Sequence, residues 1–140
     1  MIIYFSHPTF TFKTKTERKC KGIIKEYLEP EEIIDPSNFG LKHDRINELE
    51  RADGIVGMAI SSCLTYVVWK EMKLGKEEEA NLYTFMVENK EDIGPLVKGV
   101  PDEIRKLSKK ESKKLSYEIT KKDYQDGFIT SLVGSHKSRF

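Results

Sequence analysis

Four short runs of apolar residues divide the first part of the chain, and each reads as a strand. They cover residues 2–6, 32–35, 55–60 and 82–87. The run at 55–60 shows almost no alternation of apolar and polar residues, which is typical of a central strand covered on both faces. The first run ends at Ser6-His7-Pro8 and the second at Pro36, and both endings favour a turn.

Helical periodicity fills the gaps between these runs. Thr14 and Glu17 have the spacing of a capping box, and the apolar face that follows predicts a helix to Leu28. Further helices are expected at 41–51 and at 64–74, the latter stopped by Gly75. The alternation predicts an α/β fold: a three-layer, flavodoxin- or Rossmann-like parallel sheet with helices on both faces. The second and third strands should flank the first, and the fourth should lie beyond the third.

The end of the chain is expected to be a helical extension. The sequence is interpreted as a single domain over 1–140, with a core at 1–90 and the extension at 91–140. Pro95 and Pro101 interrupt the region, a basic helix is expected at 102–114, and the spacing of Tyr124, Phe128 and Leu132 predicts a last helical face.

Composition narrows the classes of function. Charged residues make up 34% of the chain, yet the formal net charge is only +1, so a nucleic-acid partner is not expected. Residues 98–140 carry 11 basic and 6 acidic side chains, which leaves −4 for the first 97, and a solvated helix is favoured there over an RNA contact. With no long apolar run and no paired cysteines, we expect a cytoplasmic protein that does not enter a membrane.

Polar residues follow two of the predicted strands, at the edge where open α/β sheets bind ligands. Tyr4, Ser6, His7 and Pro8 lie at the end of the first strand, and Ser61 and Ser62 follow the third. Backbone N–H groups and hydroxyls in such turns can hold a phosphate or a sugar, so these six are the candidate substrate-binding residues. The alternatives are an ordinary polar turn and an ordinary helix N-cap. The histidines have no metal-ligand spacing, so no metal or other cofactor is expected.

Two carboxylates are candidate catalytic residues. Glu71 lies among apolar neighbours on the helix after the third strand, where its pKa could be shifted for nucleophilic or base chemistry. An exposed helix residue is the alternative. Asp44 precedes the helix that leads into the third strand. Cys63 follows the serines, and an inert thiol is favoured there over a nucleophile.

Taken in order, these pieces resemble the nucleoside 2-deoxyribosyltransferase-like superfamily, which includes deoxynucleoside 5′-monophosphate N-glycosidases. The resemblance covers residues 2–87 and rests on four segments, IYFSHP at 3–8, IDP at 34–36, RADGIV at 51–56 and LGK at 74–76. It implies a nucleoside or nucleotide as the ligand, with the base above the first strand. It also implies a glutamate, on the helix after the third strand, that attacks the anomeric carbon to give a covalent intermediate.

The acidic residues depart from the family's pattern. Counted back from Gly75, the nucleophile's place falls on Val67, and Glu71 stands one helical turn later, about 5 Å along the axis. The family's aspartate before the third strand would fall on Arg45, one residue from Asp44. We therefore expect base release to be slow or absent. Three hypotheses stay open: an enzyme that uses Glu71, a non-catalytic nucleotide-binding protein, and an interaction protein whose basic end contacts RNA. A homodimer also stays open.

Overall fold

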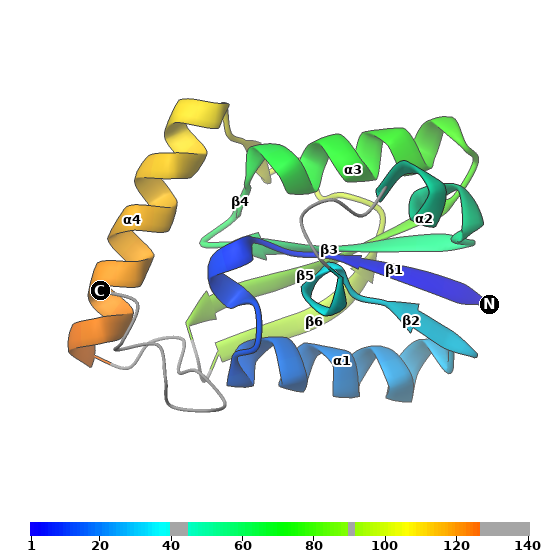
Figure 1. Cartoon of the computed structure of the whole chain (residues 1–140), viewed down its shortest axis with the longest axis horizontal. Coiled ribbons are helices and arrows are strands. Elements are labelled where there is room, and N and C mark those ends of the chain that lie inside the picture. Colours follow the sequence, from blue (N-terminus) through cyan, green and yellow to red (C-terminus); the bar gives the residue numbers. More distant parts are fainter. Residues whose placement is uncertain (40–44, 90–91, 127–140) are drawn as a thin grey trace.

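The computed structural model describes residues 1–39, 45–89 and 92–126 of the chain (Figure 1). The strands are β1 (Ile2–Ser6), β2 (Glu32–Ile34), β3 (Gly54–Ile60), β4 (Cys63–Leu64), β5 (Asn81–Asn89), β6 (Asp92–Lys98) and β7 (Arg105–Lys106). The helices are α1 (Lys15–Leu28), α2 (Arg45–Arg51), α3 (Tyr66–Glu77) and α4 (Lys109–Asp126), with short 3-10 turns η1 (Thr9–Thr11) and η2 (Pro36–Asn38).

The main sheet has the strand order β2-β1-β3-β5-β6. β1 pairs in parallel with both β2 and β3, and β3 pairs in parallel with β5. These pairings confirm the predicted α/β fold, the parallel sheet and the predicted order of its first four strands. β6 is antiparallel to β5 and carries β-bulges, and two-residue β4 and β7 extend the sheet from the end of β3.

Helices cover both faces of the sheet, as predicted: α1 lies on one face, and α2 and α3 lie together on the other (Figure 1). The side chains of β1 alternate between two cores. Ile3 and Phe5 pack with Cys20 and Ile24 of α1, whereas Tyr4 packs with the residues of α2 and α3. α4 stands at the end of the sheet to which β3 points and contacts α3 and η1.

Local sequence signals account for how the helices begin and fit. The N-cap predicted for α1 is confirmed, since Thr14 Oγ1 accepts the Glu17 N–H at 3.2 Å. The Glu17 carboxylate reaches back as predicted, but to the N–H of Lys13, at 2.6 Å, one residue before the N-cap. Gly57 leaves room for Met72 of α3, since a Cβ there would lie 2.3 Å from the Met72 sulfur. Close helix–sheet packing thus depends on a residue without a side chain.

Two predicted elements are wrong in their bounds or type. The helix expected at 64–74 starts only at Tyr66, because Cys63 and Leu64 form β4, and it continues past Gly75 to Glu77. The region from 91 onward was expected to be helical, yet it contributes β6 and β7 before α4 begins at Lys109. The expected face at Phe128 and Leu132, and residues 41–44 of the expected helix 41–51, lie outside the described residues.

Candidate functional site at the carboxyl end of the first strand

The carboxyl end of β1 presents polar side chains to both faces of the sheet. Because side chains alternate along a strand, Tyr4 and Ser6 point toward α3, and Phe5 and His7 toward α1. β1 is also where successive connections change face, since α1 follows it on one face and α2 precedes β3 on the other. This is the topological switch point at which open α/β sheets bind ligands.

Glu71 is the centre of the cluster on the α3 face. Its carboxylate accepts hydrogen bonds from Tyr4 Oη at 2.5 Å and from Ser6 Oγ at 2.6 Å. The Arg45 guanidinium of α2 lies 3.8 Å from the same carboxylate. Two hydroxyl donors and one cation therefore surround a carboxylate that is itself buried, with 6% of its surface exposed.

This geometry overturns the alternative that Glu71 is an exposed helix residue. Val67, which the family pattern places at the nucleophile's position, has half of its surface exposed. Glu71 instead reaches β1, where Tyr4 and Ser6 donate hydrogen bonds to it. Burial raises the pKa of Tyr4 far above its usual range, and the adjacent Glu71 charge and hydrogen bond raise it further. Tyr4 thus acts here as a hydrogen-bond donor.

A second polar cluster occupies the α1 face, around His7. Its ring stacks on Phe5 with centroids 4.3 Å apart. The Thr11 hydroxyl donates its single hydrogen to the Pro8 carbonyl, so His7 Nδ1 donates to Thr11 Oγ1 at 2.6 Å. His7 Nε2 faces Asp35 Oδ1 at 2.9 Å. Both ring nitrogens of His7 thus face oxygen atoms of neighbouring side chains.

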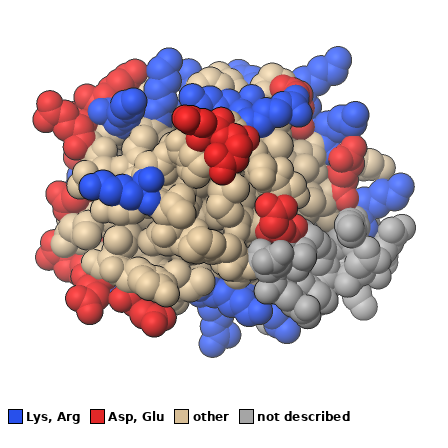
Figure 2. Space-filling model, turned by 180° about the vertical axis from the view of Figure 1, so that it is seen from behind, with Lys and Arg blue, Asp and Glu red and all other residues tan. Residues whose placement is uncertain are grey.

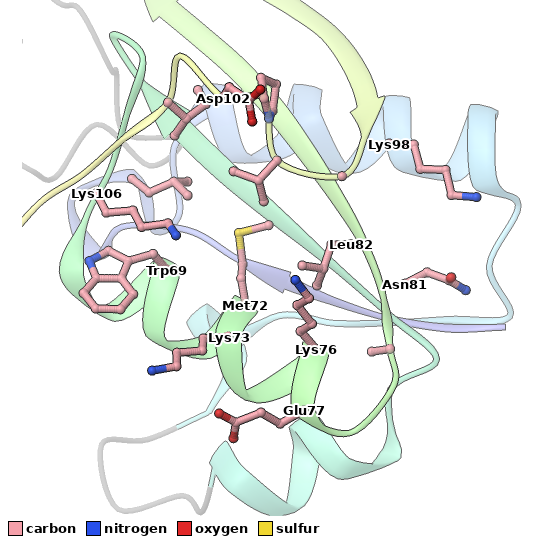
Figure 3. A pocket seen from close by; sticks show the side chains of 16 residues that line it. Trp69, Met72, Lys73, Lys76, Glu77, Asn81, Leu82, Lys98, Asp102 and Lys106 are labelled. Carbon is pink, nitrogen blue, oxygen red and sulfur yellow. The ribbon is translucent and has the colours of Figure 1, made fainter.

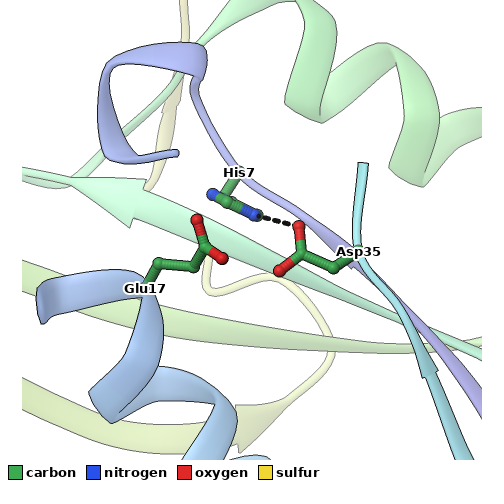
Figure 4. A group of neighbouring side chains, drawn as sticks. All are labelled: His7, Glu17 and Asp35. Atoms are coloured by element: carbon green, nitrogen blue, oxygen red, sulfur yellow. Dashed lines mark hydrogen bonds and ion pairs between the residues drawn. The ribbon is translucent and has the colours of Figure 1, made fainter. Parts of the chain in front are cut away.

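Asp35 links this cluster to α1 and η2 (Figure 4). It accepts the Ser37 N–H at 2.9 Å, and its other oxygen contacts the Lys21 ammonium. Lys21 also lies 3.1 Å from Glu17. Burial alone would raise the pKa of Asp35, but the His7 hydrogen bond and charge, together with Lys21, hold it well below its usual range.

His7, Glu17 and Asp35 have side chains of the types that bind metal ions. Ligand atoms of His7, Glu17 and Asp35 lie within 4.8 Å of one another. Lys21 already supplies a positive charge to both carboxylates, and its pKa is raised although burial alone would lower it, since Asp35 and Glu17 favour its charged form. The donor set is therefore satisfied by protein groups, and we assign it no metal.

The remaining predicted residues do not all join this site. Pro8 precedes η1 and contributes its carbonyl to Thr11. Ser61 and Ser62 are the two left-handed residues of a tight hairpin between β3 and β4, with φ of 49° and 61°, so the helix N-cap alternative is wrong. Ser6 pairs with Gly57, so Ser61 lies four residues further along β3, about 13 Å away. Asp44 lies outside the described residues.

Sequence reasoning missed several members of the two clusters. Arg45 was noted only as a departure from the family pattern, although it is the cation nearest Glu71. Glu17 was assigned to a helix cap and Asp35 to a strand end. Glu17 does lie in the cap of α1, and Asp35 follows β2 directly and caps η2. A charged residue on a mostly apolar helix face, such as Lys21 facing the sheet beside Ile24, is the signal that could have found the α1 cluster.

Comparison with known proteins returned no match: no family model, no curated protein and no solved structure resembles this chain detectably. Among the described residues, no helix has the length and apolar character needed to cross a membrane. The geometry at the end of β1 is therefore the basis for the function proposed next.

Proposed function

We propose that this protein binds a nucleoside or nucleotide at the carboxyl end of β1 and that Glu71 acts on the sugar to break its bond to the base. The observation that supports the proposal is the Glu71 carboxylate, which α3 delivers to Tyr4 and Ser6 at the switch point of the sheet. The resemblance to N-glycosidases implies a glutamate from this helix, and the contacts of Glu71 with β1 support its choice for the role.

Carboxylate chemistry at an anomeric carbon needs an ionised, oriented oxygen. Hydroxyl donors at 2.5 and 2.6 Å orient the Glu71 carboxylate. In the proposed reaction one Glu71 oxygen bonds to the anomeric carbon while the carbon–nitrogen bond breaks. The departing base keeps the electron pair and takes a proton from water. A second water then attacks the same carbon and gives its proton to the hydroxide left by the first, which releases the sugar and restores the carboxylate.

The test is base release from a panel of nucleosides and nucleoside monophosphates, followed by chromatography of the free base. Glu71→Gln should lower the rate by roughly 10³-fold or more, because an amide cannot form the glycosyl ester. Glu78→Gln is the matched control, since Glu78 is exposed just after the same helix and should leave the rate unchanged. Turnover that survives Glu71→Gln would exclude Glu71 as the nucleophile.

A second candidate function is nucleotide binding without catalysis. The low exposure of Glu71 favours it, because a carboxylate whose oxygens are both occupied by protein hydroxyls must exchange one of them to reach a sugar. Calorimetric binding without base release, and with weaker binding in Ser6→Ala, would select this function. If no nucleoside or nucleotide binds, the interaction hypothesis takes precedence over both.

A further inference from the structure

A cleft of about 1060 Å³ opens on the far side of α3 from β1 (Figure 3). It lies between α3, the first residues of β5, the end of β6 and the connection 99–106. Neither Glu71 nor any residue of β1 lines it. The cleft is thus a different part of the surface from the site described above.

The spacing of residues along α3 explains the wall of the cleft. Trp69, Met72, Lys73 and Lys76 follow one another at i, i+3, i+4 and i+7, so they share one face of the helix. Met72 is buried and forms the floor with apolar side chains of β5 and of the 99–106 connection. The surface of β5 beside α3 also lines the cleft. The floor is therefore apolar and the rim polar.

Four lysines surround this floor: Lys73 and Lys76 come from α3, Lys98 from β6 and Lys106 from β7. Within the described part of the chain none of the four ammonium groups has a carboxylate partner within ion-pair distance, unlike Lys21. Figure 2 shows lysine and arginine side chains along the upper margin, with acidic side chains among them. The rim thus carries unneutralised positive charge from three elements.

Two of the described residues that line the cleft are acidic, Glu77 and Asp102, so this lining has a net charge of +2. The Trp69 indole offers a flat surface there, and its Nε1–H is fixed by a bond of 2.8 Å to the Leu107 carbonyl. A cleft of this size suits a small molecule. We propose that it binds a nucleoside polyphosphate, with the base on the apolar floor beside Trp69 and the phosphates among the lysines.

The chain supplies its own reporter for this ligand, because Trp69 is its single tryptophan. The experiment titrates the full chain with ATP, adenosine and inorganic tripolyphosphate while Trp69 fluorescence is followed, and calorimetry repeats each titration. ATP should bind at least about tenfold more tightly than either fragment, and added salt should weaken it, because exposed charges are screened. Tripolyphosphate that binds as tightly as ATP would overturn the proposal by showing that the floor contributes nothing.

Substitutions of the lysines that line the cleft test whether ATP binds there. Lys76→Gln and Lys106→Gln should each weaken ATP binding roughly fivefold, the effect of one exposed charge pair. Lys25→Gln, an exposed lysine of α1, is the matched control and should have no effect. ATP binding that falls in Tyr4→Phe but not in the lysine variants would place the nucleotide at the end of β1 and overturn this site. Single-stranded oligothymidylate that binds more tightly than ATP would also overturn it, in favour of a nucleic-acid strand.

Discussion

Replacing Glu71 with alanine should lower the free energy of unfolding by about 3 kcal/mol. The Tyr4 and Ser6 side chains are fully buried, and both would lose their acceptor. A buried hydroxyl left without a partner costs roughly 1–3 kcal/mol, so the two together cost about 2–6 kcal/mol. Part of this cost is recovered because a carboxylate no longer has to be buried, which sets the net effect in the lower half of that range.

A double-mutant cycle separates the hydrogen bond from the packing. Tyr4→Phe alone should cost about 2 kcal/mol, because Glu71 loses a donor at 2.5 Å. In the background of Glu71→Ala the same change removes a hydroxyl that already lacks a partner, so it should recover part of the roughly 1–3 kcal/mol that this hydroxyl costs. The coupling between the two positions should therefore be at least about 2 kcal/mol.

The cycle is measured by urea denaturation followed by circular dichroism and by Trp69 fluorescence. Tyr117→Phe is the control, since this tyrosine is 70% exposed and should change stability by no more than about 0.5 kcal/mol. If the effects of Tyr4→Phe and Glu71→Ala simply add, the hydrogen bond between them stabilises nothing. The account of Glu71 as an oriented carboxylate would then be wrong.

Three further predictions concern other parts of the molecule. Gly22→Ala should stabilise α1 by up to about 1 kcal/mol, because nothing lies within 4 Å of the added Cβ. Gly75→Ala should destabilise the protein, because its Cβ would lie 2.4 Å from Ile55 Cγ1. The urea midpoints of the two variants compare these effects. Asp35→Asn should destabilise the protein at neutral pH. Since the folded pKa of Asp35 is depressed, its contribution is full above its unfolded value, near pH 4, and is lost as the pH falls toward the folded value, so thermal melts should converge at low pH. Burial raises the pKa of Cys20 to about 12, so a thiol reagent at neutral pH should label it only on unfolding. The measurement uses the Cys63→Ser variant, because Cys63 is a second free and partly exposed thiol, and labelling of the folded variant at the rate of a free thiol would contradict this.

The fold was largely predictable because its first four strands carry strong local signals. Apolar runs bounded by prolines and polar turns gave their positions within two residues, and the handedness of crossovers gave their order. β6 was missed because Gly94 and Pro95 lie in its middle, and such a pair reads as a break. The hairpin at Ser61 was missed because the turns of two-residue hairpins usually contain Asn or Gly, and serine in that position resembles a helix cap.

The site was predictable only in part, for a physical reason. Tyr4 and Ser6 could be placed at a sheet edge by strand alternation alone. The burial of Glu71 could not be predicted, because its hydrogen-bond partners lie 65 and 67 positions away along the chain. A lone carboxylate on a helix is usually exposed, and only tertiary contacts decide otherwise. The same holds for Asp35, whose neutralising Lys21 comes from a different element.

β6 has a consequence for how copies of this protein meet. Among residues 1–39, 45–89 and 92–126 it pairs with β5 alone, which leaves its other side as an open edge of the described sheet. An intact row of free N–H and C=O groups would recruit another strand and seed aggregation. Pro95 has no N–H, and the bulges opposite β5 bend the strand, so the row is broken in its middle. At the high protein concentrations of a cell, this broken edge disfavours the growth of continuous sheets between copies of the chain.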